Sequence, residues 1–190
     1  VSCASLRLSG SALESILTCP RQYYLARRAR AKRPSNQAAS FGSLIHEVAQ
    51  IAQTDNLDAT GMRALLDERW GTVDFTAPWQ ETSERAQAES MIDRLAAWFP
   101  QQSATLLGVE QGFEARVEVE GREVLLHGFV DRVELLHTEE GPKLRILDFK
   151  TMRSKPTAKS VAANVQLGLY QLAAQSGAFE ALAPGVRAVA

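Results

Sequence analysis

The spacing of apolar residues predicts that the first half of the chain is helical. The sequence SALE at residues 11–14 can form a capping box, and the helix that it opens is expected to end near Thr18 because Pro20 cannot continue it. Pro20 suits the first turn of a second helix, which we expect to run through Arg30. Three more helices are predicted, at 41–53 with Ser40 as its cap, near 58–70, and at 82–99. The last carries an apolar stripe that we expect to be core, made of Met91, Ile92, Leu95, Trp98 and Phe99.

After Pro100 the period changes to two, as in a strand with one buried face. Apolar and charged residues alternate from Phe113 to Glu120, and two later apolar runs are separated by turn-forming residues. These signals predict strands at 113–119, 124–136 and 144–150, followed by a final helix at roughly 158–175. The predicted fold class is therefore α/β, with an antiparallel meander flanked by helices and preceded by a helical segment.

Length and composition exclude few classes of protein. The chain has 190 residues, enough for one domain with a real core. Because it starts at Val1 rather than Met and stops at Ala190 without a terminating signal, we expect it to be a fragment, truncated at its C-terminus, of a longer polypeptide. No apolar run has the length of a membrane span, and 2 cysteines are too few for a disulfide framework. We therefore expect a cytoplasmic protein with no membrane partner.

The charged residues are segregated, although the net charge is only −1. No Asp or Glu occurs from Ser15 to His46, a stretch with six arginines and lysines, and a second basic stretch runs from Lys143 to Lys159. Segregated cations can follow a polyanion backbone, or they can be two solvated faces, and charge alone favours neither. The cations that we propose for DNA contact are Arg27, Arg28, Arg153 and Lys155.

Candidate chemistry is concentrated in the predicted third strand and its neighbour. Asp148 and Lys150 are two positions apart, so in a strand both face the same side. A carboxylate there can hold a divalent cation and an ammonium can orient water, whereas the bland alternative is an exposed salt bridge. Asp131 interrupts an apolar strand that should pair with this one, and Arg132 points to the other face. Two such acids predict a Mg²⁺ or Mn²⁺ site, and an Asp131–Lys150 ion pair is the alternative.

Two helical positions extend this set. His46 falls outside the apolar arc of helix 41–53, and Gly42, one turn earlier, clears space on the same face, as a close approach to a ligand requires. A solvated histidine is the alternative. Gln166 and Tyr170 are four positions apart on the final helix and share a face, from which they could contact a phosphate, a base or Lys150. Core packing explains the tyrosine equally well.

Taken together, these motifs resemble the RecB-type nucleases of the PD-(D/E)XK superfamily. They are GSLIHEV, GFVDRVE, LRILDFKT and VQLGLYQLA, in the family's order, after the lead-in LSGSALESILTCPRQYYLARR. The likeness covers about residues 6–178 and is greatest to the C-terminal nuclease module of actinobacterial AdnB/RecB-like helicase-nucleases. It implies a restriction-endonuclease-like fold with a mixed sheet, and one nuclease domain over 1–190, with a helical lead-in at 1–100 and a catalytic core at 101–178.

The resemblance also implies a role for each matching residue. The metal ligands would be His46, Asp131, Asp148 and the main-chain carbonyl of Phe149; Lys150 would be catalytic; and Gln166 with Tyr170 would lie near the DNA. Relatives with an iron–sulphur cluster use a cysteine at the position of Cys19 and three more near the domain's end. Because no cysteine follows Cys19, this chain cannot supply four ligands: either the protein lacks the cluster or the remaining cysteines lie beyond Ala190. Within this chain we expect Cys19 to be a buried thiol.

The function that we predict is a metal-dependent deoxyribonuclease of exonuclease type, in which water attacks the phosphodiester in line. The family implies a helicase-nuclease that processes double-strand breaks for recombination repair, with the helicase region in the parent chain or in a partner subunit. The DNA, single-stranded or a duplex end, would be bound through its backbone, without sequence preference. The rival is a catalytically inactive module that binds DNA or a partner subunit, and the presence of His46, Asp131, Asp148 and Lys150 favours the enzyme.

Overall fold

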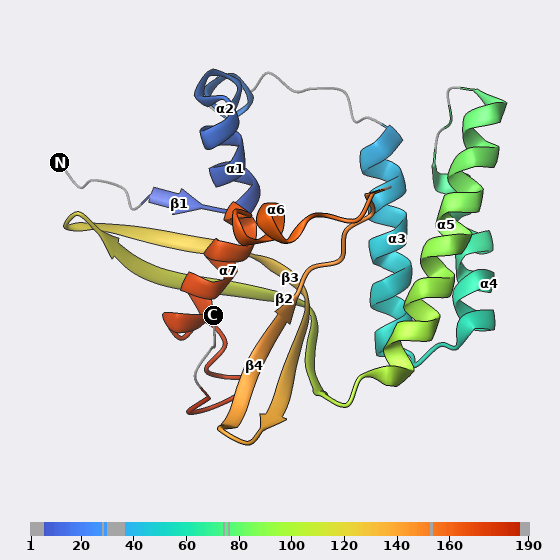
Figure 1. Ribbon diagram of the computed structural model, residues 1–190. Coiled ribbons are helices and arrows are strands. Elements are labelled where there is room, and N and C mark those ends of the chain that lie inside the picture. Colours follow the sequence, from blue (N-terminus) through green and yellow to red (C-terminus); the bar gives the residue numbers. More distant parts are fainter. Residues whose placement is uncertain are drawn as a thin grey trace. The chain divides into compact units, whose positions relative to one another are not determined.

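The computed structural model describes residues 6–27, 29, 37–73, 75, 77–152 and 154–186, which form two compact units (Figure 1). The first unit contains 1–33, 104–148 and 156–190, and the second contains 34–103 and 149–155. Each unit has its own buried cluster of apolar side chains. The chain therefore leaves the first unit directly after Asp148 and returns to it at Pro156.

The first unit is built on a sheet that has four strands over the described residues. The strands are β1 (Leu6–Leu8), β2 (Thr105–Val119), β3 (Arg122–Thr138) and β4 (Gly141–Leu147). β2 and β4 pair antiparallel with β3, whereas β1 pairs with it in parallel. The mixed sheet and its meander confirm the predicted fold class. The sequence pattern does not reveal β1, because three residues are too few to show a period.

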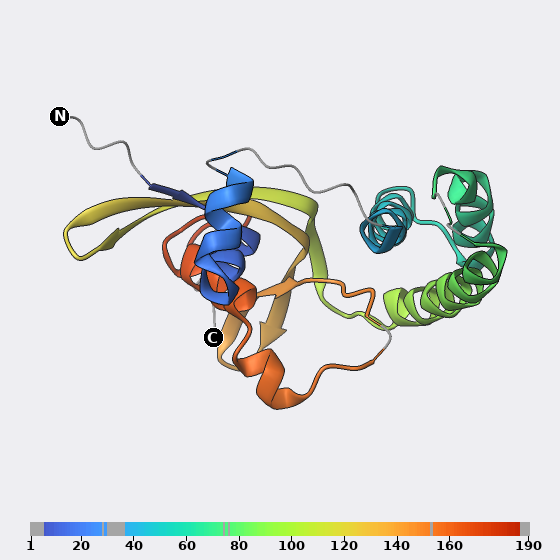
Figure 2. The ribbon, with the colours of Figure 1, turned by 90° about the horizontal axis from the view of Figure 1, so that it is seen from above.

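The described residues of the first unit also form helices α1 (Gly10–Thr18), α2 (Pro20–Arg27), α6 (Ala158–Ala162) and α7 (Val165–Gln175). α7 packs alongside β2 and β3 (Figure 2), and its Tyr170 and Ala173 join the buried cluster, while α1 packs on α7. Val124, Leu126 and Val130 of β3 belong to the same cluster. Because side chains alternate along a strand, the even positions from Val124 to Val130 face the core, and the odd positions of this stretch face the other way.

The second unit is helical. Its helices are α3 (Gln37–Thr54), α4 (Ala59–Arg69) and α5 (Pro78–Trp98), with short 3₁₀ turns at Trp70–Thr72 and Phe99–Gln101. The predicted stripe on α5 is core in the structure: Met91 and Ile92 are buried, while Leu95 and Phe99 are half-buried against the same cluster. No described helix has the combination of length and apolar composition that crossing a membrane requires.

Several predicted helix boundaries are wrong. Ser9, not Ser11, caps α1, because its side chain accepts a hydrogen bond from Ala12 N at 3.2 Å. α2 ends at Arg27, and Arg30 lies outside the described residues. α3 begins at Gln37 and α5 at Pro78, both earlier than predicted. The predicted final helix is broken into α6 and α7, because Asn164 accepts from Leu167 N at 3.0 Å and starts a new helix.

The predicted strand boundaries also need correction. β2 begins at Thr105, well before the alternating stretch at 113–119, and β3 extends the predicted 124–136 at both ends. β4 runs over Gly141–Leu147 instead of 144–150. The backbone of 148–150 is therefore not part of the sheet.

A buried carboxylate joins β3 to β4. Glu134 is 0% exposed; Arg132 Nε donates to its Oε1 at 2.5 Å, and Arg145 Nε donates to its Oε2 at 2.6 Å. Glu134 and Arg145 are direct partners in the ladder. A slip of one residue would turn one side chain to the other face of the sheet and leave the buried charge uncompensated. The network therefore fixes the register of β3 with β4.

We expect Glu134→Ala to lower the free energy of unfolding by about 3–5 kcal/mol, because two guanidinium groups lose their shared counter-charge inside the protein. Urea unfolding followed by circular dichroism measures this change. Glu140→Ala is the matched control, since it removes an exposed carboxylate that pairs with Lys143, and it should leave the midpoint unchanged. Equal losses for the two variants would contradict the role given to Glu134.

Candidate metal and catalytic site

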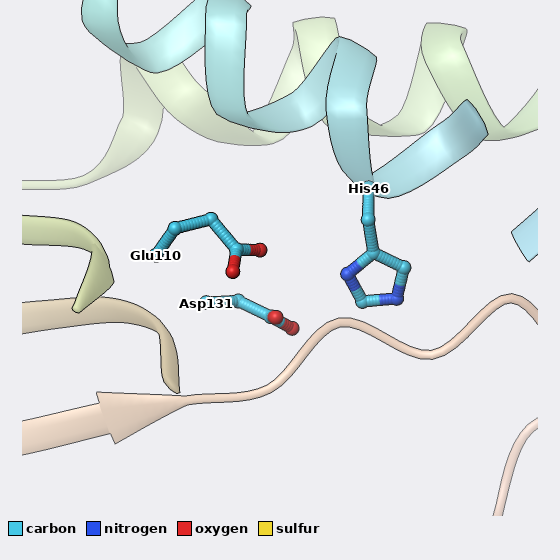
Figure 3. A group of neighbouring side chains, drawn as sticks. All are labelled: His46, Glu110 and Asp131. Carbon is cyan, nitrogen blue, oxygen red and sulfur yellow. The ribbon is translucent and has the colours of Figure 1, made fainter. Parts of the chain in front are cut away.

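Two carboxylates face each other across the pairing of β2 with β3. The ladder pairs Val109 with Arg132, and the same register continues beyond that pair, which places Glu110 opposite Asp131. A carboxylate oxygen of each lies within 4.8 Å of the other, and both side chains are half-buried (Figure 3). Like charges directly opposite each other destabilise a sheet, whereas carboxylate oxygens are preferred ligands of hard divalent cations. The pair therefore fits a divalent cation.

Glu110 holds a backbone conformation that is uncommon for a residue with a Cβ atom. Its φ is +46°, in the left-handed region. The register of β2 against β3 also shifts between Leu106 and Gly108, so the strand is irregular just before this point. Such conformations cost about 1–3 kcal/mol and cluster at functional sites. Glu110 was not among the residues predicted from sequence; the available signal was an acid between two glycines, Gly108 and Gly112, ahead of the alternating stretch.

Asp148 follows β4 on the other side of β3. The last ladder pair joins Leu147 to Arg132, so continuing the register by one residue places Asp148 opposite Asp131. The prediction that a strand carries both Asp148 and Lys150 on one side is wrong, because the ladder ends at Leu147. Only two peptide units separate the Cα atoms of Asp148, the last residue of this part of the first unit, and Lys150, which belongs to the second unit.

Tyr170 connects α7 to β3 and to Asp148. It is 4% exposed, and its hydroxyl donates to the main-chain carbonyl of Phe129 at 3.0 Å. The same oxygen lies 3.4 Å from Asp148 Oδ1 and accepts from Gln166 Nε2 at 2.5 Å. A phenol has one proton, so the shorter contact, to the carbonyl, is the better hydrogen bond. Gln166 and Tyr170 share a helix face and contact each other, while their contact with DNA stays a prediction.

The surroundings of Tyr170 keep its phenol protonated, so that its hydroxyl can donate a hydrogen bond. Burial raises the pKa of the Tyr170 phenol above its ordinary value, and the charge of Asp148 raises it further, while the hydrogen bond from Gln166 lowers it. Asp131 raises this pKa as well. The phenol is therefore protonated throughout the physiological range, and its hydroxyl can hold the carbonyl of β3.

Gly10 allows α1 to approach α7 closely at this same place. Gly10 is buried, and a Cβ atom added there would lie 2.9 Å from Gln166 Cγ and 3.5 Å from Gln166 Cα. Contacts that short do not occur without movement of the neighbour. The absence of a side chain at position 10 therefore helps to set where Gln166 lies, and with it the partner of Tyr170.

His46 and the segment Phe149–Lys155 belong to the second unit. His46 is half-buried on α3. A Cβ atom at Gly42, one turn earlier, would lie 3.3 Å from Thr151 Oγ1, and Gln87 Nε2 donates to Thr151 O at 3.4 Å. The expectation that Gly42 clears space for a ligand is therefore wrong, because this segment of the chain lies in that space.

Phe149 anchors the start of this segment. Its ring lies edge-to-face against Trp98 at 6.0 Å and Phe99 at 6.2 Å between centroids. The next side chain, Lys150, is exposed. The aromatic contacts therefore hold the backbone at Phe149, while the amine that follows is accessible to solvent.

Imidazole nitrogen and carboxylate oxygen are the two kinds of atom that this site offers to a metal ion. His46, Glu110 and Asp131 each offer one atom that can bind a metal ion (Figure 3). Asp148 offers a further carboxylate, with its Oδ2 buried. A set rich in carboxylate oxygen favours Mg²⁺ or Mn²⁺ over the metals that thiolates bind.

The other predicted residues are four cations and a cysteine. Arg27 ends α2 and Lys155 precedes α6, and both side chains are exposed. Arg28 and Arg153 lie outside the described residues. Cys19 is a free, half-buried thiol.

Comparison with models of known families matches residues 7–189 to the PD-(D/E)XK nuclease superfamily. The chain belongs to this superfamily. Among curated relatives it is similar to a subunit of the ATP-dependent helicase/deoxyribonuclease of Carboxydothermus hydrogenoformans, with 28% identity over 201 residues. That similarity covers 90% of this chain but only 18% of the relative, so the chain spans less than a fifth of the relative's length. Both findings confirm the resemblance seen in the motifs, and the mixed sheet agrees with the superfamily's fold.

Tyr170→Phe should lower the free energy of unfolding by about 1–3 kcal/mol, because the buried carbonyl of Phe129 loses its donor. Urea unfolding of the two proteins gives the difference. Tyr24→Phe is the control, since Tyr24 is 61% exposed, and its stability should match that of the wild type. No loss on Tyr170→Phe would mean that the hydroxyl does not hold β3.

Proposed function

We propose that this chain is a metal-dependent deoxyribonuclease domain that hydrolyses phosphodiester bonds. The observation that carries the proposal is the cross-strand pair of Glu110 and Asp131 in a member of the PD-(D/E)XK superfamily. Sheet stability does not call for two half-buried acids in opposition, and the strained φ of Glu110 adds a further cost. A site that binds a divalent cation accounts for both.

We propose five ligands for Mg²⁺ or Mn²⁺, in one nuclease domain over residues 1–190. Glu110, Asp131 and Asp148 would supply carboxylate oxygens, and His46 and the main-chain carbonyl of Phe149 would complete the set. When bound, the ion supplies Lewis-acid chemistry, since it polarises a phosphoryl oxygen and lowers the pKa of water. Iron–sulphur chemistry is not part of the proposal.

Lys150 is the residue that we propose to act on the reacting groups. Its exposed ammonium can orient the attacking water and stabilise the negative charge that develops on the phosphate. In this step the water oxygen forms a bond to phosphorus and gives up one proton to solvent, the bond from phosphorus to the ester oxygen breaks, and the leaving oxygen takes up a proton from solvent.

The name of the relative supports DNA as the substrate and a helicase as the partner. We propose that Arg27, Arg28, Arg153 and Lys155 contact the phosphates of the strand without sequence preference. The helicase would be in the same polypeptide or in a partner subunit. Cleavage would proceed from DNA ends, as in processing of double-strand breaks for recombination repair.

Metal binding has a test that does not depend on activity. Mn²⁺ at about 100 times its Kd should raise the free energy of unfolding by about 2.7 kcal/mol, and Asp131→Asn or Glu110→Gln should remove most of this gain. In EDTA the same substitutions should stabilise slightly, because they relieve like-charge repulsion. Thermal unfolding measures both effects. Glu118→Gln, an exposed acid on the same strand, should retain the full gain; if Glu110→Gln retains it too, Glu110 is not a ligand.

Catalysis is tested with linear and circular DNA, single-stranded and duplex, in Mg²⁺, Mn²⁺ or EDTA. We expect linear DNA to be cut only with metal, and Asp148→Ala or Lys150→Met to lower kcat by at least about 100-fold. Glu118→Gln should cut at the wild-type rate. DNA binding without cleavage in either metal would identify the inactive module instead, and unchanged cleavage by Asp148→Ala would contradict the assigned site.

A further inference from the structure

Phe129 exposes an aromatic ring on the face of the sheet opposite to the core. It is 67% exposed, although its neighbour Val130 is 0% exposed. Alternation along β3 puts Phe129 on the same side as Asp131, two positions later. Residues two apart on a strand are separated by about 7 Å. An exposed aromatic surface therefore adjoins the carboxylate pair at roughly the spacing of one nucleotide.

Glycine keeps the surface beside Phe129 flat. Gly112 is its partner on β2, and a Cβ atom there would lie 3.2 Å from Phe129 Cε1. The next pair repeats this arrangement on the core face, where Phe113 lies against Gly128. The inner ring of Phe113 is packed against Tyr170 at 5.8 Å between centroids. Only one edge of the Phe129 ring lies against Gly112, and the rest of the ring is exposed and could contact the ring of a ligand.

The hollow around Phe129 does not have the charge of a phosphate site. It is lined in part by Arg7, Glu114 and His127. Arg7 Nη2 donates to Glu114 Oε1 at 2.8 Å, so the guanidinium and the carboxylate offset each other. A neutral aromatic surface, with a guanidinium plane and an imidazole beside it, matches a planar and uncharged ring.

We propose that Phe129 stacks on an unpaired base of the DNA strand whose phosphate lies at Glu110 and Asp131. This inference rests on the proposed nuclease function and names its substrate class as single-stranded DNA. A base inside a duplex has both faces covered by its neighbours, whereas an unpaired base can offer a free face to Phe129. Stacking of this kind tolerates any base, which agrees with the absence of sequence preference that we propose for the phosphate contacts.

Binding is tested by fluorescence anisotropy in EDTA, with a labelled thymidine oligonucleotide and a matched strand of abasic units. The wild type should bind the base-bearing strand about tenfold more tightly. Phe129→Ala and Phe129→Leu should both reduce this ratio towards one, whereas Phe129→Trp should keep it. The leucine variant separates stacking from simple apolar cover. Trp79→Ala, which removes an aromatic residue that is 71% exposed in the second unit, should keep the wild-type ratio.

Kinetics with Mg²⁺ separate this inference from the proposed function. On single-stranded DNA, Phe129→Ala should raise KM about tenfold and change kcat less than twofold, because stacking positions the strand without touching the reacting atoms. Intact cleavage with an unchanged KM and equal binding of the two strands would overturn the stacking role alone. Absence of cleavage by the wild type would overturn the nuclease function, while the anisotropy ratio would still decide the stacking.

An exposed phenylalanine can also form part of an interface with another protein molecule. Size-exclusion chromatography without DNA tests whether Phe129 mediates self-association. Association of the wild type that Phe129→Ala abolishes, together with an unchanged anisotropy ratio, would assign the ring to an interface between proteins and overturn the proposal. A single elution volume for both proteins supports it.

Discussion

The buried charge network of Glu134 is the interaction on which the geometry of the site depends. Glu134 is fully buried, so loss of either arginine partner would leave an uncompensated charge and destabilise the protein. Arg145 pairs with Glu134 because the two residues face each other across β3 and β4. That register fixes the last pair of the ladder, Arg132 with Leu147, which directly adjoins Asp131 and Asp148 in the sequence. The network therefore helps to align the two acids without belonging to the site.

β3 contributes residues both to the apolar core and to the candidate metal site. Val124, Leu126 and Val130 lie in the apolar cluster with α7, while Asp131 has Glu110 opposite it on β2 and lies one residue beyond the last β3–β4 pair, next to the position of Asp148. Two carboxylates opposite each other, one of them on a residue with positive φ, are unfavourable for folding alone. The packing of the core face offsets this cost. Because one side of β3 is packed in the apolar core, the sheet can carry acidic residues on the other side.

Periodicity predicted most of this fold, and its failures have physical causes. The stripe of α5 and the alternation of β2 after Phe113 were visible because burial on one side imposes a period. The first part of β2 was not, since its irregular register near Gly108 removes the alternation. Glu110 was missed for the same reason. The end of β4 was misplaced because Phe149 is apolar like a strand residue, yet it belongs to the second unit, where its ring packs on Trp98 and Phe99. Asp131, Asp148 and Lys150 could be predicted from the sequence, because charged residues within apolar runs are costly to bury unless they are paired or bind a metal ion.

The close contact between α1 and α7 has a consequence for how the acids could be disturbed from a distance. Gly10 borders Gln166, Gln166 donates to Tyr170, and Tyr170 holds the carbonyl of Phe129, two residues before Asp131. A single methyl group at the start of the first helix would push on this relay and shift the central acid without replacing any ligand. A substitution at Gly10 would thus act on the carboxylate pair from a distance, through packing alone.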